Sequence, residues 1–255
     1  MSKPRRTALV TGGARGLGRA IAEQLGRDGA TVVIGDVDES EMHRTANALV
    51  DGGIDAAPQT LDVSDERSVR RAFVEIERRF GRLDILINNA GVLGLQDGER
   101  PLVEDMSLDL WRRTLDVNLT GAFLASRSAI PLMKRGKWGR IVNLSSRAGR
   151  MRTGLGNSNY AASKSGLIGF SRVLAGEVGR DGITVNCVAP SRVATAMTLA
   201  LADSSAFFDR NIEETAVGRL AEPGDVASAV AFLCSDAARF VTGAVIDVNG
   251  GSYMA

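Results

Sequence analysis

Short apolar runs rich in valine and isoleucine alternate along this 255-residue chain with longer amphipathic stretches. Runs that are apolar on both faces are typical of parallel strands, because helices cover such strands from both sides. Parallel pairing in turn needs a long crossover between strands, usually a helix. The pattern predicts seven strands, of which the third is the least regular: Thr7–Thr11, Thr31–Gly35, Ala56–Leu61, Asp84–Ile87, Arg140–Leu144, Thr184–Ala189 and Ala244–Val248.

The amphipathic stretches predict the covering helices. In Ser64–Phe80, the apolar residues Val69, Phe73 and Ile76 recur at spacings of four and three, which places them on one helical face. Alternating strands and helices of this kind form an open parallel sheet. We therefore expect one α/β domain over residues 1–255, a Rossmann fold with a doubly wound seven-stranded parallel sheet and helices on both faces.

Composition excludes several classes of function. A net charge of +1 provides no global field for nucleic acid or anionic lipid, so we expect a small-molecule partner. No apolar run reaches the roughly 18 residues that span a bilayer, and MSKPRRTALV leads straight into a strand, so we expect a cytosolic protein. Cys187 and Cys234 lack metal-ligand spacing and are expected to be buried thiols, while His43, the only histidine, is expected to be exposed. We expect no metal.

A glycine-rich segment, TGGARGLG at Thr11–Gly18, follows the first predicted strand and precedes a predicted helix at Arg19–Arg27. Glycine lets the backbone approach a pyrophosphate closely, and a helix N-terminus presents free N–H groups and a positive dipole to phosphates. The order of strand, glycines and helix predicts a dinucleotide site. The expected contacts are Gly12, Arg15, Gly16, Leu17 and Gly18.

Asp36 follows the second predicted strand, where an acid can accept hydrogen bonds from an adenosine ribose. A 2′-phosphate there would carry a charge of roughly −1.5 to −2 and would be repelled, so the residue favours NAD over NADP. Arg15 could offset this by pairing with a 2′-phosphate. The alternative is that Asp36 is a simple turn or cap residue. We expect NAD.

Further motifs follow the glycines in a fixed order. The glycine spacing is Gly12, Gly16, Gly18, and after it come LDV at 61–63, NNAG at 88–91, DVNLTGAF around Asn118, LSS at 144–146 and YAASK at 160–164. With these motifs the chain resembles the short-chain dehydrogenase/reductase family from Thr7 to Gly251. One departure is Pro190-Ser191-Arg192, where the family usually has Pro-Gly.

The resemblance implies additional cofactor contacts. Asp62 and Val63 would contact adenine, NNAG would steady the sheet and line the cofactor cleft, and the segment after the sixth strand would contact the carboxamide. From the residues alone, a helix cap is the preferred interpretation of Asp62 and a turn that of NNAG. The implied set is Asp62, Val63, Asn89, Ala90, Gly91, Tyr160, Lys164, Pro190, Val193 and Thr195.

The resemblance also implies a catalytic set of Asn118, Ser146, Tyr160 and Lys164. Tyr160 and Lys164 are four residues apart on one helical face, so the ammonium can lower the phenol pKa from its usual value of about 10. Tyr160 would exchange the proton of the substrate oxygen, and Ser146 would hold that oxygen. Asn118 would bend its helix and hold a water that relays the proton from Lys164.

Alternatives remain open for these four residues. The pair Tyr160 and Lys164 could lie on a solvated helix face, and Asn118 could be a cap or a satisfied core amide. The interval from Ser146 to Tyr160 is one residue longer than the commonest family spacing, so Ser145 competes with Ser146 as the serine that contacts the substrate.

Four arginines are expected to border the substrate pocket: Arg147, Arg150, Arg152 and Arg192. Guanidinium groups suit bidentate binding of an oxyanion, so we expect an anionic substrate group. The alternative is that they are solvated or pair with acids at a subunit contact. Residues at about 192–215 read as a substrate-loop insertion, and within it Met197–Phe208 reads as a helical lid or as core.

The predicted function is hydride transfer between NAD(H) and a secondary alcohol or ketone, such as a sugar, polyol, hydroxy acid or other anionic small molecule. A 3-oxoacyl-(acyl-carrier-protein) reductase is the alternative that GNSNYAASK and residues 218–251 also resemble, although such reductases usually take NADPH and Asp36 argues against it. A non-catalytic NAD(H) sensor is disfavoured because Tyr160 and Lys164 are both present. The resemblance implies a homotetramer, since residues 218–251 pack between subunits in relatives.

Overall fold

A computed structural model describes residues 5–153, 157–195 and 212–254 of the chain. Its strands are β1 (Thr7–Thr11), β2 (Thr31–Asp36), β3 (Ala56–Thr60), β4 (Ile85–Asn88), β5 (Gly139–Leu144), β6 (Ile183–Pro190) and β7 (Val245–Val248). Its helices of at least eight residues are α1 (Gly16–Arg27), α2 (Glu39–Asp51), α3 (Glu66–Phe80), α4 (Leu108–Leu115), α5 (Gly121–Gly136), α6 (Ser158–Val178) and α9 (Pro223–Cys234).

The strands form a single parallel sheet in the order β3-β2-β1-β4-β5-β6-β7. The order reverses between β1 and β4, because the chain winds outward in one direction from β1 and in the other from β4. Open α/β sheets bind ligands at the carboxyl ends of the strands beside such a reversal. The predicted fold and all seven predicted strands are confirmed.

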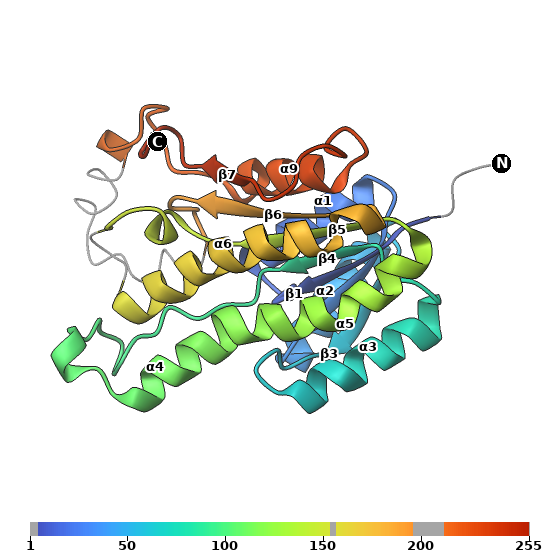
Figure 1. Cartoon of the computed structure of the whole chain (residues 1–255), viewed down its shortest axis with the longest axis horizontal. Coiled ribbons are helices and arrows are strands. Elements are labelled where there is room, and N and C mark those ends of the chain that lie inside the picture. The colour runs from blue at the N-terminus through green and yellow to red at the C-terminus, as the bar shows by residue number, and fades with distance from the viewer. Residues whose placement is uncertain (1–4, 154–156, 196–211, 255) are drawn as a thin grey trace.

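Helices cover both faces of the sheet, so the core has two halves (Figure 1). Consecutive strand residues point to opposite faces. Ala8 and Val10 accordingly join a buried cluster with Ile21 of α1, whereas Leu9 joins a second cluster with Phe73 of α3. The first half also takes in α2 and α9, and the second takes in α5 and α6.

Element boundaries depart from the sequence prediction where local groups decide them. Helix α1 already begins at Gly16, because the last glycines of the loop are part of its first turn. Helix α3 begins at Glu66, since the Asp65 carboxylate accepts hydrogen bonds from the backbone N–H groups of Arg67 and Ser68. It ends at Gly81, whose φ of +69° is accessible to glycine without strain.

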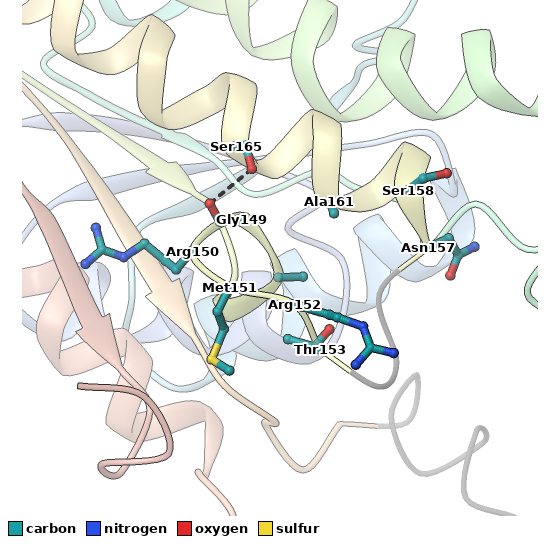
Figure 2. Close-up of a pocket in the computed structure, with 10 residues that line it drawn as sticks. Gly149, Arg150, Met151, Arg152, Thr153, Asn157, Ser158, Ala161 and Ser165 are labelled. Atoms are coloured by element: carbon teal, nitrogen blue, oxygen red, sulfur yellow. Dashed lines mark hydrogen bonds between the residues drawn. The ribbon is translucent and has the colours of Figure 1, made fainter. Parts of the chain in front are cut away.

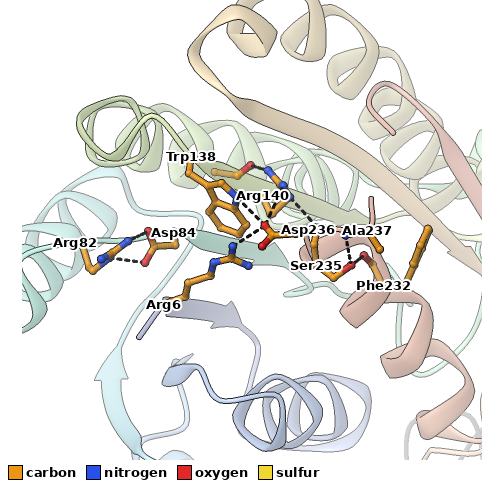
Figure 3. A network of polar contacts seen from close by, with 10 residues as sticks. Arg6, Arg82, Asp84, Trp138, Arg140, Phe232, Ser235, Asp236 and Ala237 are labelled. Carbon is orange, nitrogen blue, oxygen red and sulfur yellow. Dashed lines mark hydrogen bonds and ion pairs between the residues drawn. The ribbon is translucent and has the colours of Figure 1, made fainter. Parts of the chain in front are cut away.

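A polar network closes the end of the sheet opposite the ligand-binding edge (Figure 3). The guanidinium carbons of Arg6 and Arg140 lie 3.6 and 4.1 Å from the ring centroid of Trp138. Asp236, just beyond α9, accepts hydrogen bonds from Arg6 at 2.6 Å and from the Trp138 indole at 3.2 Å. These contacts hold the residues next to β1, β5 and α9 together at the end of the sheet away from the glycine loop.

The remaining expectations concern the cysteines, the histidine, membrane spans, metal ligands and the lid segment. Cys187 and Cys234 are buried, and burial raises the pKa of Cys187 to about 11, as expected for inert thiols. His43 is exposed on α2. The described ranges contain no helix long and apolar enough to cross a bilayer, and no group of three potential metal ligands. The expected lid at Met197–Phe208 lies outside the described residues.

Candidate active site

The glycine loop packs as closely as it does because Gly12 and Gly18 carry no side chain. Gly12 has a φ of +62°, and a Cβ on it would lie 2.9 Å from the Ala90 Cα. A Cβ on Gly18 would lie 2.1 Å from the Gly12 carbonyl oxygen, so helix and loop could not pack as they do. No side chain caps the N-terminus of α1, which leaves its first-turn N–H groups available. These residues fit a pyrophosphate.

The NNAG segment supports this loop from β4. The Thr11 hydroxyl accepts hydrogen bonds from the backbone N–H groups of Asn89 and Ala90, each at 3.1 Å. The Asn89 side-chain amide donates to the carbonyl oxygens of Thr11 and Gly12 at 3.0 and 2.9 Å. Sequence reasoning did not single out Thr11, because a threonine within a strand carries no signal of a polar role.

Asp36 ends β2 with both carboxylate oxygens facing backbone N–H groups. One accepts from Ala14 in the glycine loop at 3.0 Å, and the other accepts from Asp38 at 3.1 Å. Arg15 pairs with the Asp38 carboxylate, which also caps α2 through the Glu41 N–H. Arg15 therefore already has an acidic partner, and two carboxylates lie together at the end of β2.

Asp62 and Val63 follow β3 at the same edge of the sheet. The Asp62 carboxylate accepts hydrogen bonds from the backbone and hydroxyl of Ser64 at 2.9 and 2.6 Å, so it shapes its own turn. Val63 is buried, and a Cβ added to Gly121 of α5 would lie 2.8 Å from it. These contacts make Asp62 a turn residue, whereas the residue that caps α3 is Asp65, so the helix-cap alternative for Asp62 is wrong. An adenine contact of Asp62 stays a prediction.

The segment after β6 lies against the glycine loop. Val193 forms a parallel bridge with Ala221, and the Ala194 N–H donates to the Ala221 carbonyl at 2.9 Å. A Cβ added to Gly16 would lie 3.8 Å from the Thr195 methyl carbon. Thr195 thus lies beside the glycine loop, and the cofactor contacts of Pro190, Val193 and Thr195 stay predictions.

The two serines after β5 point in different directions. The Ser145 hydroxyl is buried and donates to the Lys164 carbonyl oxygen at 2.8 Å, so it fixes α6 against β5. The Ser146 side chain lies close enough to the Tyr160 phenol to lower its pKa. It also accepts from the Ala148 N–H at 3.1 Å, which fixes its rotamer. Of the two candidates, Ser146 shares the site with Tyr160.

Tyr160 and Lys164 lie on one face of α6, but they interact differently from the expectation. Burial raises the Tyr160 pKa above its usual value, and the hydrogen bond with Ser146 opposes that shift. The Lys164 ammonium lies 5.6 Å from the Tyr160 ring centroid and donates to the Leu144 carbonyl at 2.7 Å. Burial lowers the Lys164 pKa to about 8. The group that lowers the phenol pKa here is therefore Ser146 rather than the lysine.

Asn118 lies in a π-helical turn, Asp116–Thr120, between α4 and α5. Its side chain is buried and exchanges hydrogen bonds with the Val92 backbone, accepting at 2.7 Å and donating at 2.9 Å. It also donates to Ser163 of α6 at 3.1 Å. The expected bend is present, and the side chain tethers the segment after NNAG to α6. Gly91 lies between this side chain and the Lys164 ammonium.

Two asparagines that the sequence did not reveal hold the start of α6. The side-chain amide of Asn157 donates to the Gly94 carbonyl at 2.5 Å. Asn159 donates to the Thr114 hydroxyl at 3.0 Å, and its carbonyl oxygen accepts from the Tyr160 N–H at 2.8 Å. These contacts set the position of Tyr160. No spacing rule could identify them, because their partners lie more than forty residues away.

The four arginines do not form one group. Arg150 turns to Asp247 of β7, with 3.1 Å between the charged atoms, and lies 5.4 Å from the Tyr253 ring centroid. Arg152 is exposed and points away from Arg150, beside a cavity of about 400 Å³ between the 148–153 loop and α6 (Figure 2). Arg147 and Arg192 are brought together at a second, smaller cavity. Arg150 therefore fits the ion-pair alternative rather than a substrate contact.

Comparisons with known proteins agree with this geometry. A family model described as enoyl-(acyl carrier protein) reductase matches residues 12–253. The chain is 40% identical over 254 residues to the 3-oxoacyl-[acyl-carrier-protein] reductase FabG of Pseudomonas aeruginosa, with 100% of both chains covered. A solved 3-oxoacyl-[acyl-carrier protein] reductase from Brucella melitensis superimposes with a TM-score of 0.92 at 39% identity, covering 98% of this chain and 92% of the other.

A second Brucella melitensis structure of such a reductase contains bound NAD and matches with a TM-score of 0.89 at 39% identity, again covering 98% and 92% of the two chains. The chain belongs to the short-chain dehydrogenase/reductase family. It is an oxidoreductase of carbonyl or hydroxyl groups that uses a nicotinamide cofactor. Among the expected functions, the 3-oxoacyl reductase alternative is supported better than the sugar and polyol reading.

Proposed function

We propose that the protein is an NAD(H)-dependent reductase of 3-oxoacyl thioesters. The observation that carries the proposal is that Ser146, directly after β5, lies close enough to the Tyr160 phenol to affect its pKa, on the side of α6 where Lys164 also lies. Two hydroxyl groups from different elements are thereby available to one substrate oxygen. Relatives with this activity in their names match the chain over its full length, which supports the acyl substrate.

The protonation state of Tyr160 favours reduction. A phenol whose pKa is raised by burial stays protonated at neutral pH, so it is ready to donate a proton to a carbonyl oxygen. Oxidation would need the phenolate, which burial disfavours. When bound, reduced nicotinamide supplies the hydride to the carbonyl carbon. Ser146 would orient the oxygen through its own hydrogen bond.

Lys164 and Asn118 would restore the proton after each turnover. With its pKa lowered to about 8, the Lys164 ammonium can release a proton near neutral pH more readily than an ordinary lysine. The ammonium is fixed at the Leu144 carbonyl on the same helical face as Tyr160. Asn118 lies next to it across Gly91, in the π-helical turn that departs from the regular helix.

NAD(H) is the proposed cofactor because two acids lie together at the end of β2. Asp36 bonds the loop residue Ala14, and Asp38 holds Arg15. A 2′-phosphate would approach both carboxylates, and Arg15 could not serve it without leaving Asp38. The other residues proposed to line the cofactor are the glycine loop, the NNAG segment, Asp62, Val63, Pro190, Val193 and Thr195.

The assay is NADH consumption with acetoacetyl-coenzyme A and with the acetoacetyl thioester of N-acetylcysteamine. We expect reduction of both, and loss of at least about 10³-fold in kcat for Tyr160→Phe with unchanged NADH affinity, because the proton donor is gone. A parallel panel of sugars, polyols and hydroxy acids with NAD tests the other reading. Oxidation of that panel with no thioester reduction would refute the proposal, as would an active Tyr160→Phe variant.

The homotetramer implied by the family remains a proposal. Phe240, which follows α9, is fully exposed in the single chain, and Phe232 of α9 is 48% exposed. Large apolar side chains on one surface favour burial between subunits. Light scattering of the purified protein at micromolar concentration tests it, and a monomeric mass would contradict it.

A further inference from the structure

Three arginines approach one another at the ligand-binding edge of the sheet, each from a different loop. Arg100 lies in the segment between β4 and α4, Arg147 directly follows Ser146 after β5, and Arg192 lies just beyond β6. Strands β4, β5 and β6 are neighbours in the sheet, so these loops leave adjacent positions.

The guanidinium groups are close enough to affect one another. Burial lowers the pKa of Arg192 to about 10, and the positive charges of Arg147 and Arg100 add to that shift while Glu214 opposes it. Arg147 is 9% exposed, and its guanidinium lies 3.6 Å from the exposed carboxylate of Glu214, measured between nitrogen and oxygen. Like charges held together in a partly buried place create a positive potential that an anion would relieve.

A small polar cavity lies between these groups. It has a volume of about 10 Å³, which is room for a single oxygen atom, and is lined by Arg147, Ser191, Arg192, Thr215, Leu220 and Ser252. The Ser252 hydroxyl oxygen is buried and has no hydrogen-bond partner. A buried hydroxyl without a hydrogen-bond partner is costly, and an oxyanion placed at this cavity would accept a hydrogen bond from it.

We propose that Arg147 and Arg192, with Arg100 at the rim, bind an anionic group of the substrate, a carboxylate or a phosphate. The inference rests on the proposed function, because it takes the reacting carbonyl to lie at Ser146 and Tyr160. The source of the anion is either the carboxylate of a small 3-oxo acid or a phosphate on the arm of a thioester.

The test compares a charged substrate with a neutral one in two pairs. One pair is acetoacetate and its methyl ester, and the other is acetoacetyl-coenzyme A and the N-acetylcysteamine thioester. One of the two charged substrates carries the anion that the arginines bind. We expect Arg192→Met and Arg147→Met each to raise the KM of that substrate at least tenfold. The KM of the neutral member, the kcat and the NADH affinity should stay the same. Arg71→Met, an exposed arginine of α3, is the control and should change none of these.

A second variant tests the inference even if the arginine variants fail to fold. Glu214→Gln removes the carboxylate that competes for Arg147, so it should lower KM for the charged substrate several-fold. A merely structural role of the cluster would not strengthen binding. The pair whose charged member responds to the variants identifies the source of the anion. Raising the salt concentration should raise the KM of that same charged substrate.

Two failures are distinguishable. If the neutral thioester is reduced but the variants shift charged and neutral substrates equally, or Glu214→Gln leaves KM unchanged, this inference is wrong and the proposed function stands. If the wild-type protein reduces neither thioester, the proposed function itself is wrong.

Discussion

Ser146, directly after β5, lies close enough to Tyr160, in the first turn of α6, to lower the pKa of its phenol. The adjacent Ser145 points the other way and bonds the backbone of Lys164. Two adjacent positions in the loop therefore have different roles: the serine at one can contact substrate, and the serine at the other holds α6 in place. The two serines make a matched pair for experiment.

Ser146→Ala should lower kcat for thioester reduction by roughly 10²- to 10³-fold, because it removes a donor to the substrate oxygen. Ser145→Ala should change kcat less than tenfold and lower the free energy of unfolding by about 1 kcal/mol, since it breaks one buried hydrogen bond. Steady-state kinetics and urea unfolding measure the two effects. Equal loss of kcat in both variants would contradict the assignment.

The buried Lys164 should make stability depend on pH. Its pKa is lowered from 10.5 to about 8, so between these values the unfolded chain binds more protons than the folded one. Stability from this group therefore rises with pH in that window, by at most about 1.4 kcal/mol per pH unit. Urea unfolding at pH 8 and pH 10 should show this rise relative to Lys164→Met. Parallel pH dependence of the two proteins would argue against a depressed lysine pKa.

Cofactor preference should shift when the acids at the end of β2 are changed. Asp38→Asn weakens the hold on Arg15, and we expect NADP affinity to improve about tenfold, equivalent to about 1.4 kcal/mol. Asp36→Ala should raise the ratio of kcat/KM for NADPH over NADH still further by removing the nearer repulsion. Combining Asp38→Asn with Arg15→Ala should remove the part of the gain that comes from releasing Arg15. A double variant that keeps the full gain of Asp38→Asn would show that the ion pair is irrelevant to cofactor choice.

Trp138 should contribute to stability without affecting turnover. Trp138→Leu removes the ring that stacks between Arg6 and Arg140, and each cation–π contact is worth about 0.5 to 2 kcal/mol. We expect a loss of roughly 2 kcal/mol in the free energy of unfolding, with kcat unchanged at 25 °C. Arg5→Ala, which breaks an exposed pair with Asp55, is the comparison and should cost less than 1 kcal/mol. Similar losses of unfolding free energy in both variants would mean that the stacking of Trp138 with Arg6 and Arg140 does not stabilise the fold.

Much of the fold and part of the site could be read from local pattern. The period of apolar residues predicts the seven strands, because strand burial is a property of the segment itself. Gly12 and Gly18 mark the cofactor loop for an equally local reason, since a Cβ at either position would clash. The spacing of Tyr160 and Lys164 places them on one face of α6, as it would on any helix.

Contacts between distant segments could not be predicted in this way. Lys164 reaches the Leu144 carbonyl instead of the phenol, because β5 presents an acceptor closer to its ammonium. Arg150 meets Asp247 of β7 although it resembles Arg147 in sequence context. Asn157 and Asn159 position Tyr160 through Gly94 and Thr114, which belong to another loop and helix.

The sequence alone determined the order of elements, the edge of the sheet where ligands bind and the types of residue that gather there, since each follows from periodicity or from the sterics of a single residue. Only the tertiary structure decided which serine faces Tyr160, which arginines face each other and what Arg15 pairs with. The physical reason is that the direction of a loop side chain depends on partners brought close by the packing of distant segments. Sequence spacing carries no record of those partners.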